Sequence, residues 1–152
     1  MTSCVGLSKE VSSEELRRGL VGVRIIGPAE RYLFNHQSFC PSSETFIILS
    51  VKEWGVGRAL TEDSCREWSA AHLTGCTISL CKPSDIFFLR MEYAQSDDTF
   101  LFVAMKPVAC TNGKGLFVLS QWNSTPYITF AYTEERVFTD DQFLIFSLSL
   151  VK

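Results

Sequence analysis

The order of apolar and polar positions along the chain predicts a protein built mainly of β-strands. Runs rich in β-branched and aromatic residues recur roughly every 8 to 14 residues, with polar residues, glycine or proline between them. We expect strands at residues 20–26, 31–35, 45–52, 76–80, 86–93, 100–105, 116–122, 127–133 and 143–151. About nine short strands at this spacing are typical of an all-β fold, mostly antiparallel: a β-sandwich, a jelly roll or a partly closed barrel.

Alternation of side chains within a run indicates how much of the strand is buried. Phe87 and Leu89 share one face of their run while Phe88 and Arg90 share the other, which predicts a strand with one solvated side. The run 100–105 is apolar on both faces. It therefore predicts a central strand, or one whose outer face meets a helix or another subunit.

Two features of the last third of the chain also predict strand pairing. Asn112-Gly113 favours a tight hairpin turn, because such a turn needs positive φ angles that Asn and Gly tolerate. The final run places four apolar side chains on one face, namely Leu144, Phe146, Leu148 and Leu150. The last strand should therefore insert into the core, and its removal should unfold the protein.

Capping signals predict two short helices. Ser12 and Glu15 have the spacing of a capping box, and Gly19 ends the helix that follows them. A second helix is expected to begin after Thr61, which suits the N-cap position, and to run to Leu73.

Composition favours one packed domain. The chain has 152 residues, of which 46% are hydrophobic and 20% charged, so it can bury a core and intrinsic disorder is not expected. We expect a single globular β domain over residues 1–152, in which residues 1–10 are loose.

Charge and targeting signals narrow the classes of partner. The formal net charge is −3 and the lysines and arginines are scattered, so nucleic acid is not expected to bind. The first residues lack a signal-peptide pattern, and no apolar window reaches the length of about 18 residues that a membrane helix needs. We therefore expect no membrane association and an intracellular location, cytoplasmic or nuclear.

One segment gathers thiol and imidazole groups, the ligands that zinc prefers: Cys65, His72, Cys76 and Cys81. Structural zinc sites usually contain closely spaced ligand pairs such as Cys-x2-Cys, and no such pair occurs here. We therefore expect reduced, mostly buried thiols and no cofactor, with zinc as the alternative.

Motifs for catalysis are weak throughout the sequence. No Gly-x-Ser-x-Gly nucleophile elbow occurs, and the segment 55–58 places two glycines beside Arg58 without the spacing of a phosphate-binding loop. A nucleotide- or phosphosugar-acting enzyme of jelly-roll or barrel type is an alternative function, with Arg58, Asp85 and Asp98 as its candidate residues.

Aromatic side chains at the ends of predicted strands are the main candidates for binding. Loops gather at strand ends, and exposed aromatic residues there commonly contact partners. The candidate binding residues are Trp54, Arg58, Trp122 and Tyr127, with packing at the rim of the core as the alternative. The leading hypothesis is a non-enzymatic module that binds another protein, with homo-oligomer formation as a further expectation.

Three segments of the first half carry a family resemblance: Arg31-Tyr32-Leu33-Phe34 through Phe39-Cys40-Pro41, then Phe46-Ile47-Ile48-Leu49-Ser50-Val51-Lys52, then Gly57-Arg58-Ala59-Leu60. They resemble viral proteins derived from dUTPase, which keep the jelly roll after losing catalysis. The resemblance implies a jelly roll without activity, since the motifs that carry dUTPase activity do not occur, and it assigns no site residue. A leaderless secreted, cytokine-like β protein is a third alternative.

Overall fold

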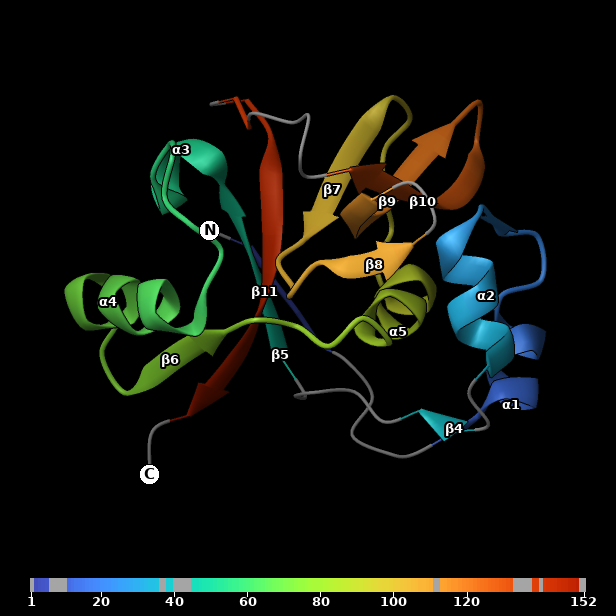
Figure 1. Cartoon of the computed structure of the whole chain (residues 1–152), viewed down its shortest axis with the longest axis horizontal. Coiled ribbons are helices and arrows are strands. Elements are labelled where there is room, and N and C mark those ends of the chain that lie inside the picture. Colours follow the sequence, from blue (N-terminus) through green and yellow to red (C-terminus); the bar gives the residue numbers. More distant parts are fainter. Residues whose placement is uncertain are drawn as a thin grey trace.

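A computed structural model describes residues 2–5, 11–35, 38–39, 45–110, 113–132, 138–139 and 141–150 (Figure 1). A nine-stranded mixed sheet contains β1 (Thr2–Val5), β3 (Arg24–Ile25), β5 (Thr45–Ser50), β6 (Cys76–Ser79), β7 (Thr99–Val103), β8 (Val108–Cys110), β9 (Gly113–Trp122), β10 (Thr125–Tyr132) and β11 (Phe143–Leu150). A two-stranded sheet contains β2 (Val11–Ser12) and β4 (Ser38–Phe39). The helices are α1 (Ser13–Gly19), α2 (Pro28–Asn35), α3 (Val51–Trp54), α4 (Glu62–His72) and α5 (Asp85–Glu92).

The large sheet is open, and β11 lies near its centre. Its strands follow the order β1-β5-β11-β7-β9-β10-β3, with β6 paired to β11 and β8 paired to β9. β11 is antiparallel to β5 and β6 and parallel to β7. The prediction of a β-rich fold is confirmed. In the described part of the chain, however, one mixed sheet covered by helices takes the place of the stacked or closed sheets that the sequence predicted.

Helices cover both faces of the sheet. Consecutive strand residues point to opposite faces, and both sets are apolar, so each face forms its own core with helices packed on it. In β5, Phe46 and Ile48 face a core that includes apolar residues of α1, α2 and α5, whereas Ile47 and Leu49 face a core that includes residues of α3 and α4. We call these two sides of the sheet the α5 face and the α4 face. Figure 1 shows α3 and α4 on the left of β11 and α1, α2 and α5 on its right.

Helix α5 lies where the sequence predicted a strand at 86–93, so that prediction is wrong. Residues Asp85 to Arg90 are all buried, because α5 packs against β9, β10 and α1. Burial on every side removes the polar stripe that identifies an amphipathic helix in a sequence. Pro83 and Asp85, which favour the first turn of a helix, are the signals that mark its start.

The strand predicted at 31–35 is also wrong, since these residues belong to α2. This helix begins at Pro28, whose fixed φ suits the first helical position. The preceding Gly27 has a φ of +63°, which turns the chain sharply away from β3. Ala29 and Leu33 are buried against the α5 face.

Both helices predicted from capping signals are confirmed. The Ser12 hydroxyl accepts a hydrogen bond from the Glu15 amide at the start of α1, and the Thr61 hydroxyl accepts one from the Ser64 amide at the start of α4. A capping box at Ser50 also begins the single turn α3, whose first two residues were predicted as the end of the strand 45–52.

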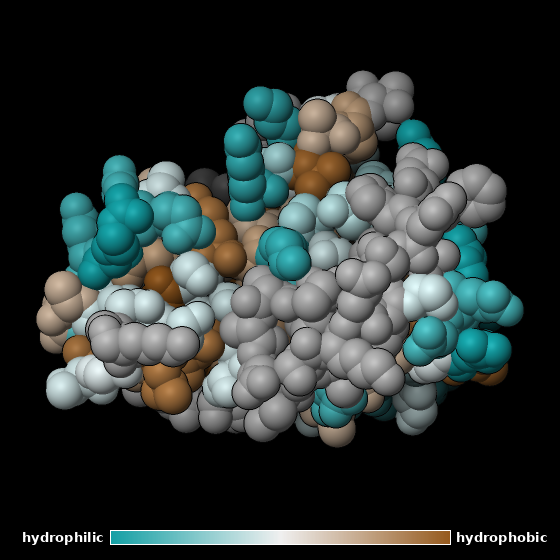
Figure 2. All heavy atoms as spheres, turned by 90° about the horizontal axis from the view of Figure 1, so that it is seen from below, coloured by the Kyte–Doolittle hydropathy of each residue, from teal (hydrophilic) through white to brown (hydrophobic). Residues whose placement is uncertain are grey.

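The strands predicted near the C-terminus are largely confirmed. β7 is central, between β9 and β11, and β8 pairs with β9 so that Cys110 lies opposite Gly113; residues 111 and 112 of that turn lie outside the described residues. In β11, Leu144 and Phe146 are buried, but Leu150 is 84% exposed. Viewed from below (Figure 2), the side of α4 and β6 shows both hydrophobic and hydrophilic residues, whereas the side of α1 and α2 is mostly hydrophilic.

A buried arginine joins α5 to the sheet. Arg90 Nη1 donates hydrogen bonds to the carbonyl oxygens of Ser120 and Tyr127, at 3.0 and 3.2 Å, and to Gln95 Oε1 at 2.9 Å. Its Nη2 donates to the Tyr93 carbonyl at 3.3 Å. Within the described ranges no carboxylate pairs with this cation and its Nε has no partner. Burial lowers the pKa of the guanidinium, an effect that Tyr93 partly opposes.

Replacement of Arg90 by methionine should lower the free energy of unfolding by roughly 2–4 kcal/mol, because one buried and two partly buried carbonyl groups lose a charged donor. Urea denaturation measures this change. The same replacement at the exposed Arg66 is the matched control and should have little effect. Equal effects at the two positions would show that Arg90 contributes no more than a surface arginine.

Side chains of α4 cover the free edge of β6. The Ser69 hydroxyl accepts a hydrogen bond from the Ile78 amide at 2.9 Å and donates one to the Cys65 carbonyl at 2.7 Å. Glu62 Oε1 accepts a hydrogen bond from the Leu80 amide at 2.9 Å. Unpaired amides on a sheet edge invite pairing with other chains, so α4 protects this edge from aggregation.

Replacement of Ser69 by alanine should therefore cost about 1–2 kcal/mol of unfolding free energy, since it leaves the buried Ile78 amide without an acceptor. It should also speed hydrogen exchange at that amide. Ser149→Ala, at an exposed position of β11, is the control for loss of a serine hydroxyl. If both variants unfold at the same urea concentration, the edge contact does not stabilise the fold.

Candidate functional site

Helices α3 and α4 cover the α4 face at β5 and β6, and the part of this face formed by β7, β9 and β10 lies beside them. Strand register places Phe100, Ser120 and Tyr127 in one row across these strands, and Phe102, Val118 and Thr129 in the next row. We call this surface the open sheet face and include Trp122, which follows Ser120 by two residues and therefore points to the same side.

Two large aromatic side chains stand out on the open sheet face. Phe100 is 58% exposed and Trp122 is 64% exposed, whereas Val118, in the next row on β9, is buried. Trp122 is the diagonal neighbour of Phe100 across the β7–β9 pair, a position from which long side chains can meet. The two exposed rings therefore lie on the same side of neighbouring strands.

A tight turn holds Trp122 in place. Asn123 and Ser124 connect β9 to β10 with φ angles of +51° and +65°, as a two-residue hairpin turn requires. Asp97 Oδ1 accepts hydrogen bonds from the Ser124 amide at 2.8 Å and from Gln121 Nε2 at 3.0 Å. The backbone that carries Trp122 is thus tied to the loop before β7.

A hollow of about 280 Å³ opens beside Phe100. Its lining has polar and apolar parts and consists of Phe100, Phe102, Val118, Thr129, Phe130, Ala131 and Gln142. The Gln142 side-chain oxygen accepts a hydrogen bond from the Thr139 amide at 3.0 Å, and Phe138 packs edge-on against Phe102, with ring centroids 5.3 Å apart. An apolar group can therefore enter next to the Phe100 ring.

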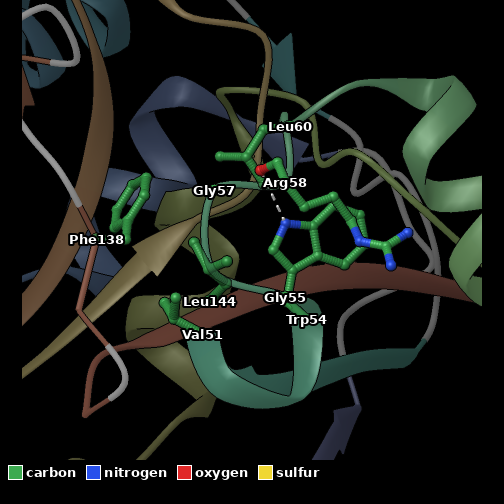
Figure 3. Close-up of a pocket in the computed structure, with 8 residues that line it drawn as sticks. All are labelled: Val51, Trp54, Gly55, Gly57, Arg58, Leu60, Phe138 and Leu144. Carbon is green, nitrogen blue, oxygen red and sulfur yellow. Dashed lines mark hydrogen bonds between the residues drawn. The ribbon is translucent and has the colours of Figure 1, made fainter.

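A second hollow lies on the same face of the sheet, around Trp54, and we call it the Trp54 pocket. It has a volume of about 250 Å³ and is lined by Val51, Trp54, Gly55, Gly57, Arg58, Leu60, Phe138 and Leu144 (Figure 3). The indole Nε1 of Trp54 donates to the Arg58 carbonyl at 3.3 Å, and the indole ring lies 4.8 Å from that of Phe146. The Arg58 guanidinium carbon lies 5.3 Å from the centre of the Trp54 ring.

The structure divides the four predicted binding residues between two places. Trp122 and Tyr127 lie on the open sheet face, Trp122 exposed and Tyr127 half-buried. Trp54 is only 2% exposed, so it forms a buried wall of a pocket, with Arg58 packed over it. Phe100 was not among the predicted site residues, although the apolar character of both faces of its run was the signal that could have identified it.

The predicted zinc ligands do not form a cluster. Cys65 is buried in α4, and the Cys81 thiol donates to the Ile145 carbonyl at 3.6 Å. His72 is exposed and stacks on Trp68, with ring centroids 4.5 Å apart, while the Cys76 thiol points to the Thr74 carbonyl at 3.9 Å. Among the residues that the structure describes, no three His, Cys, Asp or Glu side chains are placed to hold a metal ion.

The candidate residues for nucleotide chemistry are also separated. Asp85 is buried at the start of α5, where its carboxylate accepts a hydrogen bond from the Lys82 amide at 2.8 Å. Asp98 is exposed on the loop before β7, and neither aspartate lines the Trp54 pocket or the hollow of the open sheet face. Arg58 is the one member of this set that lines either hollow.

The fold and these surfaces define an open mixed β-sheet between two helical layers. Comparisons with models of known protein families, with curated proteins and with solved structures found no match. Across the helices of the described ranges, none has the length and apolar character that crossing a membrane requires.

Burial raises the pKa of the Cys65 thiol to about 12, because the thiolate would lose its hydration. At pH 8, Cys65 should therefore remain a thiol and react with iodoacetamide far more slowly than the partly exposed Cys76. Peptide mapping by mass spectrometry measures the two rates, and in urea they should become similar. Equal rates in the folded protein would show that Cys65 is accessible.

Proposed function

We propose that this protein is a non-enzymatic module that binds another protein through the open sheet face. The observation that carries the proposal is the joint exposure of Phe100 and Trp122 on one side of neighbouring strands. Tryptophan is among the residues that contribute most to protein–protein affinity, and clustered exposed aromatic groups mark such contacts.

The energetics of this surface support a protein partner. Covering the exposed parts of both rings would contribute on the order of 5 kcal/mol before the cost of association, given about 25 cal/mol per Å² of apolar surface. The hollow beside Phe100 can accept an apolar side chain of the partner. Thr129 and Gln142 provide polar groups in its lining, as the rim of a protein interface does.

Preorganisation of the backbone also supports binding. Trp122 precedes a hairpin turn that Asp97 fixes through two hydrogen bonds, and Arg90 anchors the Ser120 carbonyl two residues earlier. A contact residue on a rigid strand loses little conformational entropy when it binds, so more of the interaction energy appears as affinity.

Site-specific photocrosslinking tests this function. With p-benzoylphenylalanine in place of Trp122, irradiation of cells should give a discrete crosslinked adduct, because a bound partner covers this position. An adduct of twice the chain mass identifies a second copy of this chain, and any other discrete mass identifies a different protein.

The control places the same photoreactive residue at Thr77, an exposed position of β6. Phe100→Ser should abolish the adduct formed from position 122, while Val21→Ser, at another exposed apolar residue, should leave it unchanged. Similar adducts from positions 77 and 122, or an adduct that survives Phe100→Ser, would refute the proposal.

A further inference from the structure

Arg58 places a cation beside the Trp54 pocket. Its guanidinium packs over the Trp54 ring, and no carboxylate within the described residues forms an ion pair with it. In Figure 3 the guanidinium extends past the indole, on the side away from Phe138. The pocket therefore has apolar walls around Phe138, Leu144 and Val51 and a positive charge outside them.

The loop after α3 holds this cation in position. Gly55 has a φ of +118°, and a Cβ atom there would lie 3.1 Å from Arg58 Nε, so the absence of a side chain lets Arg58 fold back over Trp54. Gly57 has a φ of +81°, and the Arg58 amide donates to the Gly55 carbonyl at 3.0 Å. The Trp54 indole closes the same loop by donating to the Arg58 carbonyl.

The size of the pocket indicates what it holds. Its volume of about 250 Å³ lies below the range of roughly 300–1,000 Å³ that is usual for small-molecule sites. A single large apolar side chain is a suitable occupant. Because the charge stands outside the apolar walls, the matching carboxylate belongs on a residue next to the one that enters.

We propose that the Trp54 pocket receives one apolar side chain of an acidic peptide segment, while Arg58 pairs with the carboxylate of an adjacent aspartate or glutamate. This assignment rests on the protein-binding function proposed above and specifies the chemistry of the partner. The Trp54 pocket and the open sheet face lie on the same side of the sheet, and Phe138 contacts both: it lines the pocket and packs on Phe102. One partner can therefore reach both sites.

Nuclear magnetic resonance titration with two dipeptides tests the pocket. The probes are N-acetyl-Phe-Asp-amide and its neutral counterpart N-acetyl-Phe-Asn-amide, and the reporter is the indole N–H resonance of Trp54, assigned with Trp54→Phe. The aspartyl peptide should shift this resonance and bind about two- to fivefold more tightly than the asparaginyl peptide, the advantage that an exposed ion pair provides. Added salt should reduce the difference.

Arg58→Gln should remove the preference for the aspartyl peptide, and Arg66→Gln, at another exposed arginine, should preserve it. Folding of Arg58→Gln is expected, since the Trp54 indole bonds to the carbonyl of residue 58 and not to its side chain. Equal affinities for the two peptides in the wild-type protein, or no shift at up to about 10 mM of either, would overturn the proposal.

Failure of this proposal is distinguishable from failure of the protein-binding function. If crosslinking from position 122 succeeds while the titration shows no shift, the pocket does not hold the peptide and the open sheet face still binds a protein. If the titration succeeds and no specific adduct forms at 122, the pocket binds the peptide without the open sheet face.

Discussion

The packing of α5 on the sheet depends on the hydrogen bonds of the Arg90 guanidinium. It crosses from α5 to the sheet and donates to the carbonyl oxygens of Ser120 and Tyr127, which lie opposite each other on β9 and β10. Isolated cations are costly to bury, and here neutral acceptors replace water around the charge. The position of α5, and with it the core of the α5 face, is therefore coupled to the hairpin that carries Trp122.

This coupling connects the core with the surface that we propose for binding. The α5 face is covered by three helices, so it contributes packing, while the α4 face leaves its β7, β9 and β10 portion outside the helical cover. The groups that we propose for contact lie on that side: the exposed rings of Phe100 and Trp122, the hollow beside Phe100, and the Trp54 pocket beyond Phe138. The packing on the α5 face thus fixes the strands that carry the exposed groups of the α4 face.

The sequence predicted local features better than it predicted the layers. Strands such as β11 and the caps of α1 and α4 depend on short-range patterns, and the sequence identified them. Helix α5 was assigned to a strand because tertiary burial on all sides removed its polar face. Because α2 and α5 were both predicted as strands, the sequence predicted a sandwich, a jelly roll or a partly closed barrel in place of a sheet covered by helices. Among the candidate binding residues, Trp122 is exposed at the end of a strand, where the sequence placed it. Trp54 instead follows the alternative of packing at the rim of the core, and its burial depends on a single turn, α3, and on the contact with Phe146.

The central position of β11 also has a kinetic consequence. Ile145 pairs with Ile48 on one side and with Val103 on the other, so three segments far apart in the chain must meet before this part of the sheet exists. Contacts between distant segments carry a large loop-closure entropy, and folding rates fall as their share rises. During synthesis, β5 and β7 emerge from the ribosome long before the strand that separates them, and until then both expose apolar surface that chaperones recognise.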